Sequence, residues 1–161
     1  MPSAAKGMSA DVAELWRRVR SGHREGHYYV ALFGLRNYDP LHVVDQIHRG
    51  FSYAAFVRFH RNTALSLRVL AQVVEIPERT LARRKAAGRF EPDESDRLVR
   101  ASRVFARAIE LFEGNTDGAR EWLTSPVRAL GGRTPLELAS TDVGAIEVEN
   151  LIGRLEHGLP T

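Results

Sequence analysis

Residues 66–88 read SLRVLAQVVEIPERTLARRKAAG, and they contain two short helical segments with a tight turn between them. Ser66 can cap a first helix over 67–74. Pro77 ends it, because proline lacks the backbone N–H that a helix interior needs. A second helix is expected over 78–87. Two short helices joined in this way predict a helix-turn-helix.

The residue types in this segment fit the packing of such a unit. Ala71 is the small residue that lets the two helices cross closely. The apolar residues expected to hold the crossing are Leu70, Val74, Ile76 and Leu81. Glu75 occupies the turn position where glycine is usual, and its negative charge does not favour phosphate.

The second helix is strongly basic. The candidate DNA-binding residues are Arg79, Thr80, Arg83, Arg84 and Lys85. The second helix of a helix-turn-helix enters the major groove, where arginine binds guanine edges and phosphates. Arg84 falls where many such motifs place a core residue, and its aliphatic stem can pack there. The alternative for the whole helix is an ordinary solvated face.

Helix signals also dominate the N-terminal part of the chain. A helix capped by Asp11 would place Leu15 and Trp16 on one buried face, against the core. Residues 28–35 form a short apolar run that fits either a strand or a buried helix. Residues 1–10 are expected to be loose.

Proline and glycine mark most of the remaining helices. Asp39 followed by Pro40 predicts a helix start. The helices expected from this point on cover 40–50, 52–60, 92–114 and 119–123. Thr134 and Glu137 form a capping box, and a last helix is expected to end at Gly158. The sequence therefore predicts an all-α protein.

Charge is distributed unevenly along the 161 residues, whose net charge is +3. Residues 1–57 hold 7 Lys/Arg and 5 Asp/Glu, residues 58–110 hold 12 and 7, and residues 111–161 hold 4 and 8. A basic middle favours a polyanionic partner, and an acidic end favours a different partner.

Several function classes find no support in the sequence. The absence of cysteine excludes disulfides and thiol nucleophiles, and it fits a cytoplasmic protein. His23 and His27 are four apart, but Gly22 and Gly26 argue against the helix that a zinc site at this spacing needs. No phosphate-binding glycine loop or nucleophile elbow occurs. We therefore expect no enzyme activity, no cofactor, no metal site and no membrane span.

Four segments together resemble a known family, the Xre/MbcA/ParS antitoxins. They are IPERTLARRK at 76–85, PDESDRL at 92–98, ALGGRTPLEL at 129–138 and EVENLIGRLEHG at 147–158. The resemblance runs from about residue 40 to the C-terminus, and residues 1–27 lie outside it. Pro77 departs from the serine or threonine expected before the second helix.

The resemblance implies an antitoxin of a type II toxin–antitoxin module. The commonest partner in that family is a RES-domain toxin, which destroys NAD. The C-terminal domain of the antitoxin covers the entrance to the toxin's active site. The N-terminal part forms a homodimer and often represses its own operon by binding operator DNA.

The candidate toxin-binding residues lie in the last two segments of the resemblance. They are Arg133, Glu149, Leu151, Arg154, Glu156 and His157. An acidic C-terminal segment would be attracted to the electropositive pocket that the phosphates of NAD require. The alternative for the apolar residues of this helix is a place in the core.

The expected organisation has three parts: an N-terminal extension with one helix over 1–27, an Xre-like helix-turn-helix and dimerisation domain over 28–114, and a toxin-binding domain over 115–161. Tyr53, Phe56 and Phe59 are candidates for the dimer contact. The alternative function is a stand-alone helix-turn-helix transcriptional regulator whose C-terminal domain only dimerises.

Overall fold

The computed structural model describes residues 7–161 and confirms an all-α fold, with no strand among these residues. The helices in chain order are α1 (Ala10–Arg20), the 3-10 helix η2 (Tyr28–Phe33), α2 (Pro40–Arg49), α3 (Tyr53–Thr63), α4 (Leu67–Val73), α5 (Glu78–Ala87), α6 (Pro92–Leu111), α7 (Thr116–Leu123), the 3-10 turn η3 (Arg128–Leu130), α8 (Pro135–Leu138) and α9 (Asp142–Glu156). None of the helices in the described part is long and apolar enough to cross a bilayer.

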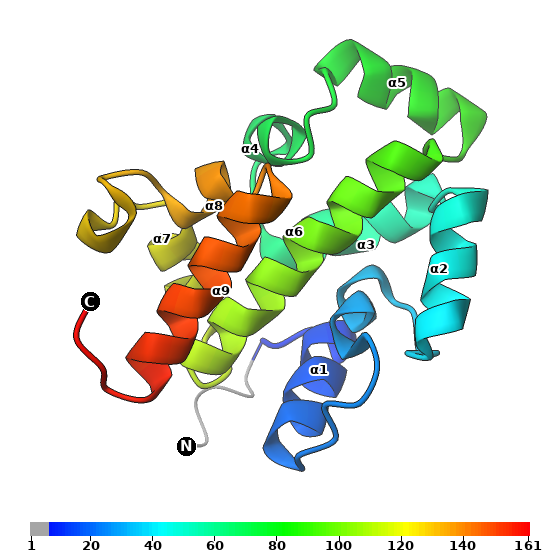
Figure 1. Ribbon diagram of the computed structural model, residues 1–161. Coiled ribbons are helices and arrows are strands. Elements are labelled where there is room, and N and C mark those ends of the chain that lie inside the picture. The colour runs from blue at the N-terminus through cyan, green and yellow to red at the C-terminus, as the bar shows by residue number, and fades with distance from the viewer. Residues whose placement is uncertain (1–6) are drawn as a thin grey trace.

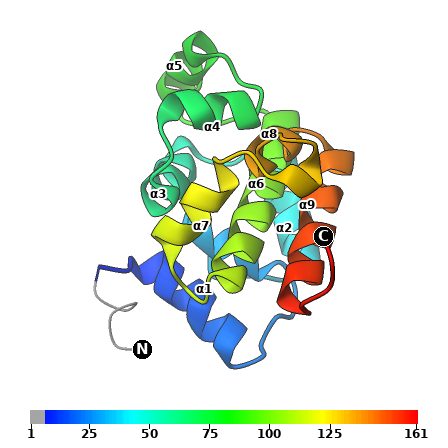
Figure 2. The ribbon, with the colours of Figure 1, turned by 90° about the vertical axis from the view of Figure 1, so that its left-hand side faces the viewer.

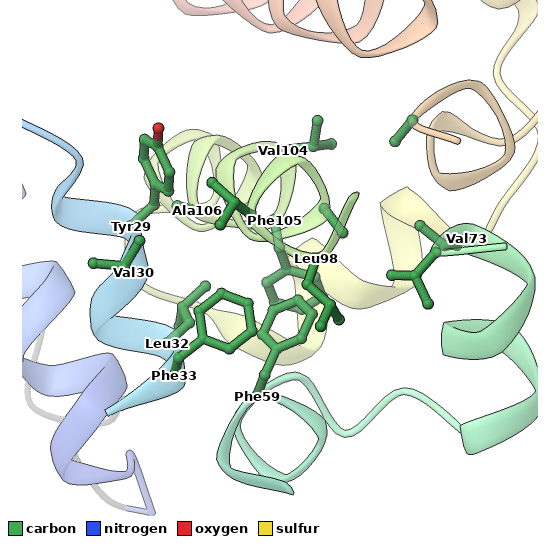
Figure 3. Packing of buried hydrophobic residues seen from close by; sticks show 14 of the residues in the cluster. Tyr29, Val30, Leu32, Phe33, Phe59, Val73, Leu98, Val104, Phe105 and Ala106 are labelled. Carbon is green, nitrogen blue, oxygen red and sulfur yellow. The ribbon is translucent and has the colours of Figure 1, made fainter. Parts of the chain in front are cut away.

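Helix α6 is the centre of the molecule, and α1, η2, α2, α7 and α9 pack against it (Figure 1). It is 20 residues long, and Leu98, Phe105 and Ile109 are fully buried along it. Figure 3 shows Phe33 of η2 and Phe59 of α3 lying against Leu98 and Phe105. The ring centroids of Phe33 and Phe59 are 4.6 Å apart. This cluster joins the first half of the chain to its central helix.

Local signals place most helix starts as the sequence predicts. Asp39 caps α2, Ser66 caps α4, and Thr141 caps α9, each by accepting backbone N–H groups of the first turn. The capping box of Thr134 and Glu137 is present at α8. Residues 28–33 form a buried 3-10 helix, which decides between the two alternatives for that run.

The predicted cap of α1 is wrong. Ser9 caps this helix, and Asp11 lies inside it, where it is buried. Its carboxylate accepts hydrogen bonds from Arg36, Arg58 and Asn62 at 2.5–3.0 Å. Burial alone would raise the pKa of Asp11, but these hydrogen bonds prevail and lower it. The acid therefore attaches α1 to the rest of the fold.

The N-terminal helix packs on the core as expected. Leu15 is fully buried, and Trp16 packs partly buried beside Gly114. Met8 also packs against the core, so the expectation that residues 1–10 are loose is wrong at their C-terminal end. Residues 1–6 lie outside the described part of the chain.

The aromatic residues of α3 are in the core of the monomer. Phe56 is 1% exposed and Phe59 is 0% exposed. The expectation that these two side chains form a dimer contact is therefore wrong, because neither is accessible to a second chain. Tyr53 is partly buried and stacks on Phe90 with ring centroids 5.8 Å apart.

Candidate functional site

Helices α4 and α5 form the predicted helix-turn-helix. Leu70, Ala71 and Ile76 are buried, and the N–H of Ile76 donates to the carbonyl of Ala71 over 3.0 Å to close the turn. Glu75 adopts a φ of +55°, a conformation that favours glycine. The turn thus has the left-handed backbone of its class, although its residue is not glycine.

The outward face of α5 carries cations without acidic partners. Arg79, Arg83 and Lys85 are exposed, and none of them forms an ion pair with any residue of 7–161. The exposed Ala82 and Ala86 lie beside Arg79 and Arg83 on this side of the helix, and the acid Glu78 is exposed as its first residue. Arg79 and Arg83 are one turn apart, so two guanidinium groups project from the same side of the helix.

Two of the predicted DNA-binding residues lie on the inner side of α5. Thr80 is buried, and its hydroxyl accepts a hydrogen bond from Arg83 over 3.3 Å. Arg84 donates two hydrogen bonds to Glu94 of α6, at 2.7 Å and 3.1 Å. The structure therefore exposes Arg79, Arg83 and Lys85, with Arg79 and Arg83 on the same side of the helix, and turns the other two inward.

Arg68, on the first turn of α4, is an exposed cation that the sequence analysis did not select. It lines a shallow hollow over the turn, together with Glu75 and Glu78. The sequence feature that points to Arg68 as a candidate phosphate contact is its position two residues after the cap Ser66. Helix N-termini beside the turn often contact phosphate. Helix α5 itself stands at one end of the molecule in both views (Figures 1 and 2).

The C-terminal region packs along the other side of α6. Arg133 is exposed at the end of the turn that contains Gly131 and Gly132, whose φ values are +69° and +79°. The carbonyl of Arg133 accepts a hydrogen bond from the N–H of Val127 over 3.0 Å, which closes the loop. This loop leads into α8 and then into α9, which runs beside α6 (Figure 1).

Arginines of α6 engage the acids of α9. Arg103 pairs with Glu149, and Arg107 pairs with Glu156 at 3.1 Å. Burial favours the neutral form of Arg103, but the hydrogen bond to Glu149 prevails and raises the pKa of this guanidinium. Two of the predicted toxin-binding acids are therefore bound within the chain.

The remaining predicted toxin-binding residues are placed differently from one another. Leu151 is 1% exposed and so is not accessible at the surface, whereas Arg154 is partly exposed and His157 is exposed.

An apolar face of α9 was missed by the sequence analysis. Val143 is 74% exposed and Ile146 is 43% exposed, and the exposed Asn150 continues the same face. The spacing of three and four residues places these residues on one face of the helix. Sequence alone does not distinguish this face from the core face, because the side of the helix that meets α6 is known only from the structure. Exposed apolar residues that cluster on one helix mark interaction surfaces.

Comparison with known proteins explains this arrangement. Residues 42–103 match the family described as the antitoxin Xre-like helix-turn-helix domain. Residues 107–158 match the family described as the antitoxin Xre/MbcA/ParS C-terminal toxin-binding domain. The chain belongs to the Xre/MbcA/ParS antitoxins.

Individual antitoxins support the assignment. The chain is 41% identical to "Antitoxin Xre" of Yersinia enterocolitica over 118 residues, which cover 73% of this chain and 80% of that one. It is 35% identical to "Antitoxin Xre" of Photorhabdus laumondii over 146 residues, which cover 90% and 89%. It is also 24% identical to the "Prs ADP-ribosylating antitoxin" of Sphingobium over 156 residues, which cover 91% and 98%.

The two matched segments of this antitoxin meet inside one helix. The helix-turn-helix match ends at residue 103 and the toxin-binding match begins at residue 107, and both positions lie within α6. The core is continuous across them, because Leu98, Ile109 and Ile152 belong to one buried cluster.

Proposed function

We propose that this antitoxin neutralises a RES-domain toxin that degrades NAD, by covering the entrance to the toxin's active site with the outward face of α9 and the loop over 128–133. The observation that carries this proposal is the exposure of Val143 and Ile146 within the segment that matches a toxin-binding domain. An apolar patch of this kind is stabilised by burial against a partner protein.

Electrostatics support a partner with a positive surface. Glu147 is exposed on α9 and forms no ion pair within residues 7–161, unlike Glu149 and Glu156. A pocket that binds the two phosphates of NAD is electropositive, so an acidic surface is attracted to its rim. The RES identity of the toxin rests on the family resemblance of the four segments quoted above.

The second part of the proposal is repression of the antitoxin's own operon. The exposed cations Arg79, Arg83 and Lys85 on the second helix of the helix-turn-helix support binding of operator DNA. A homodimer would place two such helices on successive half-sites. The exposed Leu41 and Val44 on α2, at 74% and 42%, are available for that contact.

A second toxin chemistry follows from one relative. The Sphingobium protein is named for ADP-ribosylation, and ADP-ribosyl transfer takes its group from NAD. A toxin that transfers ADP-ribose is therefore the second candidate partner. A stand-alone regulator, the alternative weighed from the sequence, is less well supported, because the toxin-binding match covers residues 107–158.

The experiment that tests the proposal measures cellular NAD after the gene beside this one is induced, with and without the antitoxin. We expect NAD to collapse when the neighbouring protein is produced alone and to recover when both are produced. Modified proteins are detected in parallel with a reagent for ADP-ribose.

Each other outcome selects a different conclusion. Accumulation of ADP-ribosylated protein identifies a transferase as the partner in place of a NAD-degrading enzyme. Growth arrest that the antitoxin relieves, with NAD unchanged, contradicts any NAD-consuming toxin. No effect of the neighbouring protein on growth or NAD removes this pairing and favours the stand-alone regulator.

A further inference from the structure

We infer that Arg84 is a positioning residue of the DNA-binding helix, which orients α5 through Glu94 and does not itself bind DNA. This inference rests on the proposed DNA binding and assigns a different role to one of its arginines. The Nε and Nη2 atoms of Arg84 donate to the two carboxylate oxygens of Glu94, at 2.7 Å and 3.1 Å. A bidentate pair of this kind sets the direction of both side chains.

Helix α5 has few other attachments along its length. Only Thr80 and Leu81 are buried among its ten residues. At its C-terminal end, the carbonyl of Gly88 accepts from the N–H of Tyr53 over 2.9 Å. Arg89 donates to the carbonyl of Gly50 over 2.6 Å. Between the buried Thr80 and Leu81 and this C-terminal end, Arg84 joins α5 to α6 through its pair with Glu94.

Glu94 is well placed to receive this pair. It is 5% exposed, and it is the third residue of α6, where its Oε1 also accepts the N–H of Glu91 over 2.8 Å. One carboxylate therefore caps the central helix and orients the DNA-binding helix. Without Arg84 it would be a nearly buried charge with a single backbone donor, which is unfavourable.

The inner position of Arg84 also separates it from the outward cations. It lies three residues after the buried Leu81, on the same side of the helix, whereas Arg79 and Arg83 face away. A rotation of α5 about its axis would move both outward arginines relative to DNA. The pair with Glu94 resists that rotation.

Two substitutions test this role, with Arg83→Gln as the matched control. In Glu94→Gln, the remaining oxygen still caps α6, but the new amide nitrogen meets the Nη2 of Arg84, so two donors face each other. In Arg84→Gln the pair is lost from the other side. The control removes an exposed arginine of the same helix that has no acidic partner among the described residues.

Binding is measured with a fluorescent duplex of about 30 base pairs from the region upstream of the gene and with a random duplex of equal length, at several salt concentrations. We expect Glu94→Gln and Arg84→Gln each to weaken binding to the upstream duplex about 10-fold, with the salt slope unchanged. Arg83→Gln is expected to lower the slope by about 0.9, as the loss of one phosphate contact does. Thermal unfolding checks that each variant is folded at the assay temperature.

The direction of the change in DNA affinity in Glu94→Gln distinguishes a positioning role of Arg84 from direct DNA binding. If Arg84 binds DNA, removal of its acidic partner releases it, and binding becomes tighter, which overturns the inference. A slope that falls in Arg84→Gln as much as in Arg83→Gln also overturns it. If the wild-type chain binds neither duplex, the proposed DNA binding fails first, and the inference fails with it.

Discussion

The outward face of α5 and the seam between α6 and α9 use arginine in opposite ways. On α5, Arg79 and Arg83 project into solvent without acidic partners. On α6, Arg103 and Arg107 are bound by acids of α9. Charge alone therefore does not mark a binding surface. The outward face of α5 and the α6–α9 seam differ in whether acids of the same chain already neutralise the arginines.

The same comparison separates the surfaces for the two proposed partners. DNA needs exposed cations, and α5 supplies them at one end of the molecule (Figures 1 and 2). A protein partner needs apolar surface that water can leave, and α9 supplies Val143 and Ile146. The two surfaces can therefore be removed independently by substitution.

The largest effect is expected from Val143→Asp combined with Ile146→Asp. Two charges in the centre of a toxin contact would lower the affinity for the toxin by about 100-fold or more, because each must be desolvated. Affinity is measured by calorimetry with the purified toxin.

The control is Val57→Asp on α3, whose side chain is 36% exposed and lies outside the segment that matches the toxin-binding domain. We expect it to leave toxin affinity unchanged. Equal losses in both variants would contradict a toxin contact on α9. Deleting residues 146–161 is a poorer test, because Val148 and Ile152 would leave the core.

The next effect is expected from Arg79→Ala combined with Arg83→Ala. We expect DNA affinity at about 0.15 M salt to fall by about 30-fold, with a salt slope smaller by about 1.8. Toxin neutralisation should stay at the wild-type level. A normal shift of upstream DNA by this variant would show that α5 is not the recognition helix.

A smaller effect is expected from Arg103→Gln, at the seam. Its pair with Glu149 is partly exposed, so we expect a loss of about 0.5 kcal/mol in the free energy of unfolding, measured in urea. Toxin affinity should change less than about 3-fold, since the outward face of α9 is untouched. A loss as large as that of the Val143 and Ile146 variant would instead place the seam in the toxin contact.

An effect of similar size and opposite sign is expected from Glu75→Gly in the helix-turn-helix. Glycine tolerates the φ of +55° at this position, so we expect a gain of about 0.5 kcal/mol in the free energy of unfolding. Loss of a negative charge beside the proposed DNA-binding surface should also tighten DNA binding slightly at low salt. Destabilisation would show that the Glu75 side chain stabilises the turn.

Sequence reasoning succeeded where the determinants are local. The capping box of Thr134 and Glu137, and the cap at Ser66, depend on residues within one helical turn, so the pattern alone predicts them. The helix-turn-helix and the all-α class followed in the same way, whereas the family came from the resemblance of the four quoted segments.

Sequence reasoning was less informative where residues far away in the chain decide the role of a side chain. The partner of Arg103 is 46 residues away in sequence, and Asp11 is bound by residues 25 to 51 positions away. No spacing rule shows such a pair before the helices are placed. For the same reason the burial of Phe56 and Phe59 in the core was not predicted. The cap of α1 is an exception, because the true cap Ser9 is a local signal that lies only two residues before Asp11.

The passage of one helix through both matched segments has a consequence for turnover of the protein. Cellular proteases act mainly on chains that have opened. Because residues on both sides of the boundary in α6 share one buried cluster, an opening that releases α9 also loosens the support of α5. Neutralisation and repression would then be lost together, and a single half-life would describe both.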